Sequence, residues 1–154
     1  AIWAYLALGP LAGFVLVWAG FIAWACFFHT GADMPALQKT IVGMSYGAVI
    51  AGIALLLATT NPLGLPGVLG TAIYVGVTVF FLVIVARFDF LSVVPANVYG
   101  YAATAAFGLQ TANAGSAITM DMTNPVLIII LSTILGAVFG LLSAKLAAAI
   151  EKKS

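Results

Sequence analysis

The sequence predicts an all-α, polytopic bundle of transmembrane helices that forms a single integral membrane domain over residues 1–154. Of these 154 residues 64% are hydrophobic and only 6% are charged, whereas a soluble domain carries about 25% charged residues. The apolar residues gather in six stretches, separated by short breaks of glycine, proline and polar residues. Because open strands and loops would leave backbone groups unpaired in lipid, each stretch is expected to be a helix.

The breaks define six expected spans. Residues 1–8 are expected to be the remaining part of a truncated first helix, which Gly9 and Pro10 end because the proline ring removes a backbone donor. The densest break, at residues 59–67, separates the third span from the fourth. The other spans are expected at residues 11–28, 38–58, 68–86, 91–109 and 126–149.

The fifth span has a marginal length and contains Pro95 in its first turns. Proline there either kinks the helix or opens it, and the segment either crosses the membrane or re-enters it. Charge placement favours a crossing, because six crossings put all five basic residues on one face, as is typical of the cytoplasmic side. These residues are Lys39, Arg87, Lys145, Lys152 and Lys153. We therefore expect both termini in the cytoplasm; a re-entrant fifth segment would remove the bias.

Small residues recur at four-residue spacing on two expected helices. Gly43 and Gly47 lie on the third, and Ser132, Gly136 and Gly140 lie on the sixth. Helices in lipid associate through close backbone approach and hydrogen bonds, so these faces are expected to pack helices together. The same faces could instead form a subunit interface or a narrow conduit. A homo-oligomer embedded in the lipid bilayer is the expected assembly.

Several functional classes lack the residues that they need. No acidic or basic residue lies mid-span, which argues against proton pumping and charged substrates. Cys26 and His29 have no further ligand at metal spacing, so neither a metal site nor another cofactor is expected. The serines have no base within their own spans, which argues against an enzyme. The chain also lacks the basic patch that nucleic-acid binding requires.

The most informative segment runs from Ser92 to Thr104. Helical spacing places Asn97, Tyr101 and Thr104 on one stripe, where an amide, a phenol and a hydroxyl could line a path for a small neutral solute. Pro95 frees a backbone carbonyl in the preceding turn, so Pro95 and Ser92 are included in the candidate lining. The alternative is that these residues cap the helix and hydrogen-bond to neighbouring helices.

Three short segments carry a resemblance to a family. Trp18-Ala19-Gly20-Phe21, Val94-Pro95 followed by Gly100, and the run from Leu135 to Gly140 resemble the YcdZ-like family of small bacterial inner-membrane proteins. This family is uncharacterised. The resemblance implies a multi-pass protein of the bacterial inner membrane and implies no function.

A second, shorter resemblance concerns the fifth span. Val94-Pro95-Ala96-Asn97-Val98 is similar to the hydrophobic-Pro-x-Asn-hydrophobic element that lines the pore of urea transporters, with Ala96 in place of the usual aromatic residue. The element occurs once in this chain. We therefore expect a channel or facilitator for a small neutral polar solute, such as urea or another amide. The alternative is a non-transporting membrane scaffold or assembly subunit that packs through its small-residue helix faces.

Overall fold

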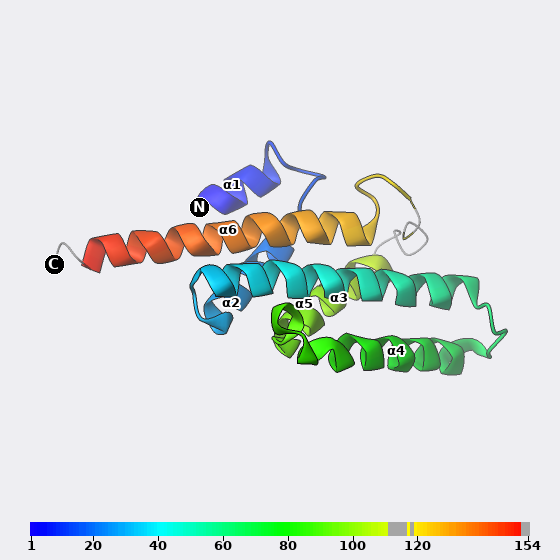
Figure 1. Cartoon of the computed structure of the whole chain (residues 1–154). Coiled ribbons are helices and arrows are strands. Elements are labelled where there is room, and N and C mark those ends of the chain that lie inside the picture. Colours follow the sequence, from blue (N-terminus) through cyan, green and yellow to red (C-terminus); the bar gives the residue numbers. More distant parts are fainter. Residues whose placement is uncertain (111–116, 118, 152–154) are drawn as a thin grey trace.

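The computed structural model describes residues 1–110, 117 and 119–151, and it is an all-α bundle (Figure 1). Its helices are α1 (Ile2–Leu8), α2 (Val17–Thr30), α3 (Met34–Thr60), α4 (Gly67–Ile84), α5 (Val94–Gln110) and α6 (Pro125–Glu151), and the 3₁₀ turns η1 (Val85–Arg87) and η2 (Asp89–Leu91) join α4 to α5. Three segments are long and apolar enough to cross a membrane: α3, α4 together with η1, and α6. Lys152 and Lys153, which the charge argument used, lie outside the described residues.

The first expected helix ends at Leu8 as predicted, but the second begins at Val17 and not at residue 11. Residues 9–16 form turns, and Gly13 has a φ of +84°, which favours glycine. The amide of Leu16 donates to Ser132 Oγ at 2.8 Å, so a side chain of α6 satisfies the backbone at this point. As a result α2 has 14 residues, fewer than the about 20 that a full crossing needs.

Helix α5 runs along α3 without turning back. Pro95 is its second residue and therefore opens the helix; it does not kink it. Along the two helices, close contacts pair Gly43 with Asn97 and, further on, Leu55 with Gly108. The positions increase together, so the two helices run in the same direction over about 18 Å. A hairpin within Val94–Gln110 is thereby excluded, while the number of membrane crossings remains a prediction.

The helices form two halves with opposite directions. The first half contains α1, α2 and α3, and the second contains α4, α5 and α6, so each half ends in a long helix preceded by a shorter one. Helices α3 and α6 are in contact and run in opposite directions (Figure 1). The most extensive contacts join the short helix of one half to the long helix of the other, namely α5 to α3 and α2 to α6.

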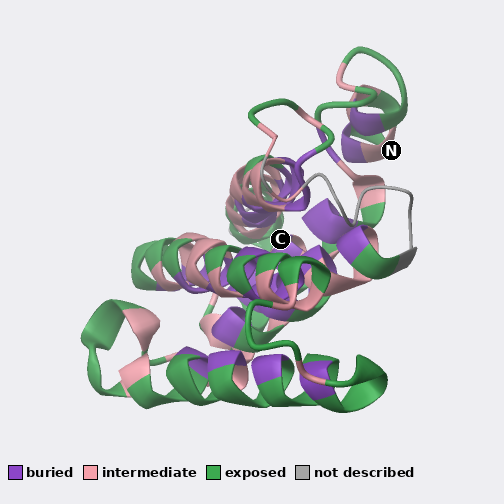
Figure 2. Cartoon of the chain, turned by 90° about the vertical axis from the view of Figure 1, so that its right-hand side faces the viewer, coloured by how far each residue is buried: buried purple, intermediate pink, exposed green. Residues whose placement is uncertain are grey.

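Burial supports this correspondence between the halves. A shift of 77 residues, which takes Gly20 to Asn97, places all five buried residues of α2 on buried residues of α5. A shift of 89 residues, which takes Gly47 to Gly136, places seven of the eight buried residues of α6 on buried residues of α3. Figure 2 shows the buried residues on the inward sides of the helices and the exposed ones outside. The described helices are therefore arranged as an inverted repeat, in which the short helix of each half packs against the long helix of the other.

Candidate functional site

The candidate site is built around the crossing of α3 and α5, where two backbones touch. A Cβ added to Gly47 would lie 1.9 Å from the carbonyl oxygen of Asn97, and one added to Gly100 would lie 1.9 Å from the carbonyl oxygen of Met44. A Cβ on Gly43 would meet the Asn97 side chain at 2.9 Å. Larger residues at these glycines would force the helices apart, so Gly43 and Gly47 fix the position of Asn97.

Asn97 is fully buried, and its amide nitrogen joins three elements. Asn97 Nδ2 donates to the carbonyl oxygens of Leu82, at 3.3 Å, and Leu91, at 3.1 Å. These acceptors lie at the end of α4 and in η2, so the side chain holds both against α5. The other polar atom of the amide, Oδ1, has no hydrogen-bond partner in the described part of the chain.

The remaining residues of the stripe also lie inside the protein. The hydroxyls of Tyr101 and Thr78 are hydrogen-bonded at 3.0 Å, which ties α5 to α4. Thr104 is fully buried, and its hydroxyl has no partner among the described residues. The spacing thus brings Asn97, Tyr101 and Thr104 to the buried side of α5. The side-chain carbonyl oxygen of Asn97 and the hydroxyl of Thr104 have no hydrogen-bond partner in the described part of the chain.

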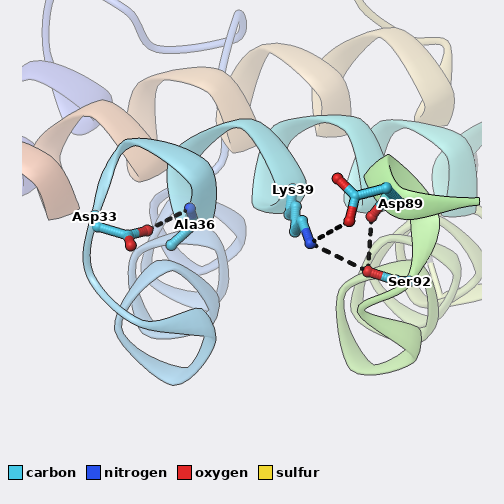
Figure 3. A network of polar contacts seen from close by, with 5 residues as sticks. All are labelled: Asp33, Ala36, Lys39, Asp89 and Ser92. Carbon is cyan, nitrogen blue, oxygen red and sulfur yellow. Dashed lines mark hydrogen bonds and ion pairs between the residues drawn. The ribbon is translucent and has the colours of Figure 1, made fainter.

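Ser92 and Pro95 lie at the entrance to α5, outside this buried stripe. Ser92 Oγ donates to the backbone oxygen of Asp89 at 2.6 Å and accepts from Lys39 Nζ at 3.4 Å (Figure 3). Lys39 also pairs with the Asp89 carboxylate at 2.9 Å, and the Asp89 side chain is 77% exposed. Ser92 therefore belongs to a polar network that joins the start of α3 to the link before α5. Nearby, Asp33 caps α3 by accepting from the Ala36 amide at 2.7 Å (Figure 3).

The small residues of α6 build the equivalent crossing with α2. A Cβ on Gly136 would lie 2.1 Å from the carbonyl oxygen of Gly20, and one on Gly140 would lie 2.8 Å from the ring of Phe27. Ser132 Oγ donates to the Ile128 carbonyl at 2.7 Å and accepts from the Leu16 amide. This small-residue face is therefore occupied by α2 of the same chain.

Thr133 and the correspondence between the halves were not predicted from the sequence. Thr133 is fully buried, and its hydroxyl is the third buried side-chain group without a hydrogen-bond partner in the described part of the chain. Under the shift of 89 residues it corresponds to Met44. The tripeptide Gly-Ala-Val at residues 47–49 recurs at residues 136–138, and this is the signal that could have revealed the repeat.

The repeat also supplies a counterpart for the Pro-x-Asn element at the start of α5. Residues 94–98 correspond to residues 17–21 under the shift of 77 residues. The counterpart reads Val-Trp-Ala-Gly-Phe, so Trp18 replaces the proline and Gly20 replaces the asparagine. The two halves therefore share the packing of this element and differ in its polar groups.

Comparison with known proteins gives a family for the chain. Residues 1–148 match a family described as "Protein of unknown function (DUF1097)". Since the match covers nearly the whole chain, the protein belongs to this family. No curated protein and no solved structure matches the chain significantly.

Proposed function

We propose that this member of the DUF1097 family is a membrane facilitator for a small neutral polar solute, and that the solute passes between its two inverted halves. The observation that carries the proposal is the inverted repeat. Many secondary transporters are built from inverted repeats, and their substrates bind at the interface between the repeats, close to interrupted helices. Here each half contributes a short helix to that interface, and the backbone before α2 is irregular.

The polar groups at this interface support a neutral solute. Asn97 Oδ1 and the hydroxyls of Thr104 and Thr133 are buried groups that bind no protein atom in the described part of the chain. A buried polar group without a partner costs free energy, so a bound water or solute would stabilise each of them. Every described Asp, Glu, Lys and Arg lies in a link or within about two turns of a helix end. An ion would therefore find no countercharge deep in the bundle.

The path is closed in this conformation, because the backbones of α3 and α5 touch at Gly47. Passage of a solute therefore requires α5 to move relative to α3. The Asn97 and Tyr101 hydrogen bonds to α4 indicate that α4 and the link before α5 move together with α5. Such a movement displaces one half of the repeat against the other, as in alternating access.

A second candidate function is that of a non-transporting scaffold that assembles through a helix face, and one feature of α4 supports it. The outer side of α4 has a hollow of about 430 Å³ beside Gly76 and Phe80. A Cβ on Gly76 would meet no atom within 4 Å, so a helix of another subunit could approach closely there. This face also suits the expected homo-oligomer.

Solute flux distinguishes the two functions. Proteoliposomes that contain the purified protein are shrunk osmotically in a panel of neutral solutes, including urea and acetamide, and their re-swelling is followed by light scattering. A facilitator makes re-swelling faster than in protein-free liposomes for at least one solute. A scaffold leaves the rate equal to that of protein-free liposomes for every solute.

A further inference from the structure

A second feature of the repeat interface is an open groove between α2 and α5, on the side of α5 away from the Asn97 stripe. Its volume is about 590 Å³, and its lining includes Trp18, Ile22, Ala25 and His29 from α2 and Tyr99 and Ala102 from α5. Under the shift of 77 residues, Ile22 corresponds to Tyr99 and Ala25 to Ala102. The groove therefore lies where the two halves face each other, and it is walled by both.

The groove is apolar along its length and polar at one end. Alanines form much of its lining, while Trp18 and Ile22 add larger apolar surfaces. His29, in the last turn of α2, and Tyr99 contact each other edge to face, with ring centroids 6.4 Å apart. Neither the imidazole nor the phenol has a hydrogen-bond partner within the residues that the structure describes. The polar end lies beside the turn that leads from α2 into α3.

We propose that this groove binds one acyl chain of a membrane phospholipid, whose phosphate or ester oxygens accept hydrogen bonds from His29 and Tyr99. From Trp18 to His29 the wall of α2 extends about 16 Å, close to the about 15 Å depth of one leaflet of the hydrocarbon core. A chain that enters from the end of α2 therefore fills the groove to its apolar end. The polarity fits an amphiphile, because His29 and Tyr99 place two hydrogen-bonding groups side by side at the end where its head would lie.

The location gives the lipid a definite effect on the protein. A chain seated between α2 and α5 contacts both halves at once, so it stabilises the packed arrangement over one in which the halves separate. Van der Waals packing of the chain against the groove wall holds the lipid, and the two hydrogen bonds orient it, because lipid tails gain no hydrophobic free energy from leaving the bilayer. The inference does not depend on transport, because it concerns the other side of α5.

Native mass spectrometry of the purified, delipidated protein, titrated with dipalmitoyl phosphatidylglycerol in detergent, tests this site. Ala102→Leu fills the groove, and Ala147→Leu makes the same change on the exposed end of α6. We expect wild type and Ala147→Leu to retain one more lipid than Ala102→Leu. Equal lipid retention by all three proteins would overturn the proposal. A lipid-free dimer that Ala102→Leu dissociates would also overturn it, because a second protein copy would then occupy the groove.

Two further variants keep the test decisive if Ala102→Leu does not fold, as judged by circular dichroism. Ala25→Leu fills the groove from the opposite wall. Tyr99→Phe preserves the ring and removes only the hydroxyl, so it should weaken the apparent lipid affinity about fivefold, the effect of one hydrogen bond. An unchanged affinity in both variants would contradict the assigned site.

Discussion

The carbonyl oxygen of Asn97 occupies the space that a Cβ on Gly47 would need, since the two atoms would be 1.9 Å apart. This contact sets the distance between α3 and α5. It also places the amide of Asn97 where it can reach the end of α4 and the following link. The small size of Gly47 and the polar contacts of Asn97 are therefore two parts of one packing arrangement.

The contact predicts opposite effects of one substitution at two glycines. Gly47→Ala should destabilise the protein by about 1–3 kcal/mol or more, because the added methyl overlaps backbone that cannot move freely. Gly76→Ala, also within a helix, should be neutral or stabilising by up to about 1 kcal/mol, because its methyl meets no atom. Apparent Tm values of both variants in one detergent measure the difference. Equal Tm values would show that the α3–α5 contact does not limit stability.

Neighbouring hydroxyls on α6 give a second matched pair. Ser132→Ala removes the acceptor of the Leu16 amide and should cost about 1 kcal/mol, because a partly buried donor loses its partner. Thr133→Val removes a hydroxyl that has no partner in the described residues and should leave stability unchanged or slightly raised. Thermal unfolding of the two variants tests this order. A larger loss of stability in Thr133→Val than in Ser132→Ala would mean that the Thr133 hydroxyl already has a hydrogen-bond partner.

Asn97→Leu should lower stability, because the carbonyls of Leu82 and Leu91 lose their donor. Hydrogen bonds between membrane helices contribute about 0.6–2 kcal/mol, so the bundle should still fold. Hydrogen exchange should increase in residues 82–93, which the amide holds in place. Val98→Leu, at the exposed neighbouring position, is the control. Unchanged hydrogen exchange of residues 82–93 in Asn97→Leu would show that the Asn97 amide does not hold this segment in place.

The membrane topology can be tested with reporter fusions. Fusions after residues 60, 88, 115 and 154 should report outside, cytoplasm, outside and cytoplasm, because the basic residues are expected on the cytoplasmic side. The parallel course of α5 and α3 supports the change of side between residues 88 and 115. A cytoplasmic signal from the fusion at 115 would contradict the six-crossing topology.

Hydropathy and the glycine and proline breaks were sufficient to predict the helical class and most helix positions. They could not predict that α2 starts at Val17, because residues 11–16 are as apolar as a helix would be. At this boundary the Leu16 amide donates to the side chain of Ser132, a residue 116 positions further along the chain. The sequence around residue 16 alone does not indicate such a long-range contact.

The candidate stripe was predictable only in part. Helical spacing places Asn97, Tyr101 and Thr104 on one side of α5, and all three are buried there. Spacing does not reveal which helices this side of α5 contacts. In the structure these helices are α3 and α4. The recurring Gly-Ala-Val tripeptide marks the repeat, but apart from Ala19/Ala96, Ala25/Ala102 and Val17/Val94 the short helices have diverged too far to reveal it.

Urea flux through wild type and Thr104→Val, at equal amounts of folded protein, tests most directly whether a solute passes between the two halves. Valine has nearly the shape of threonine, and the hydroxyl that it removes has no partner in the described residues, so the variant should remain as stable as wild type. We predict that wild type accelerates liposome re-swelling and that Thr104→Val slows it severalfold. Equal acceleration by both proteins would remove this interface as the path, and no acceleration by wild type in urea or any other neutral solute would contradict the facilitator function itself.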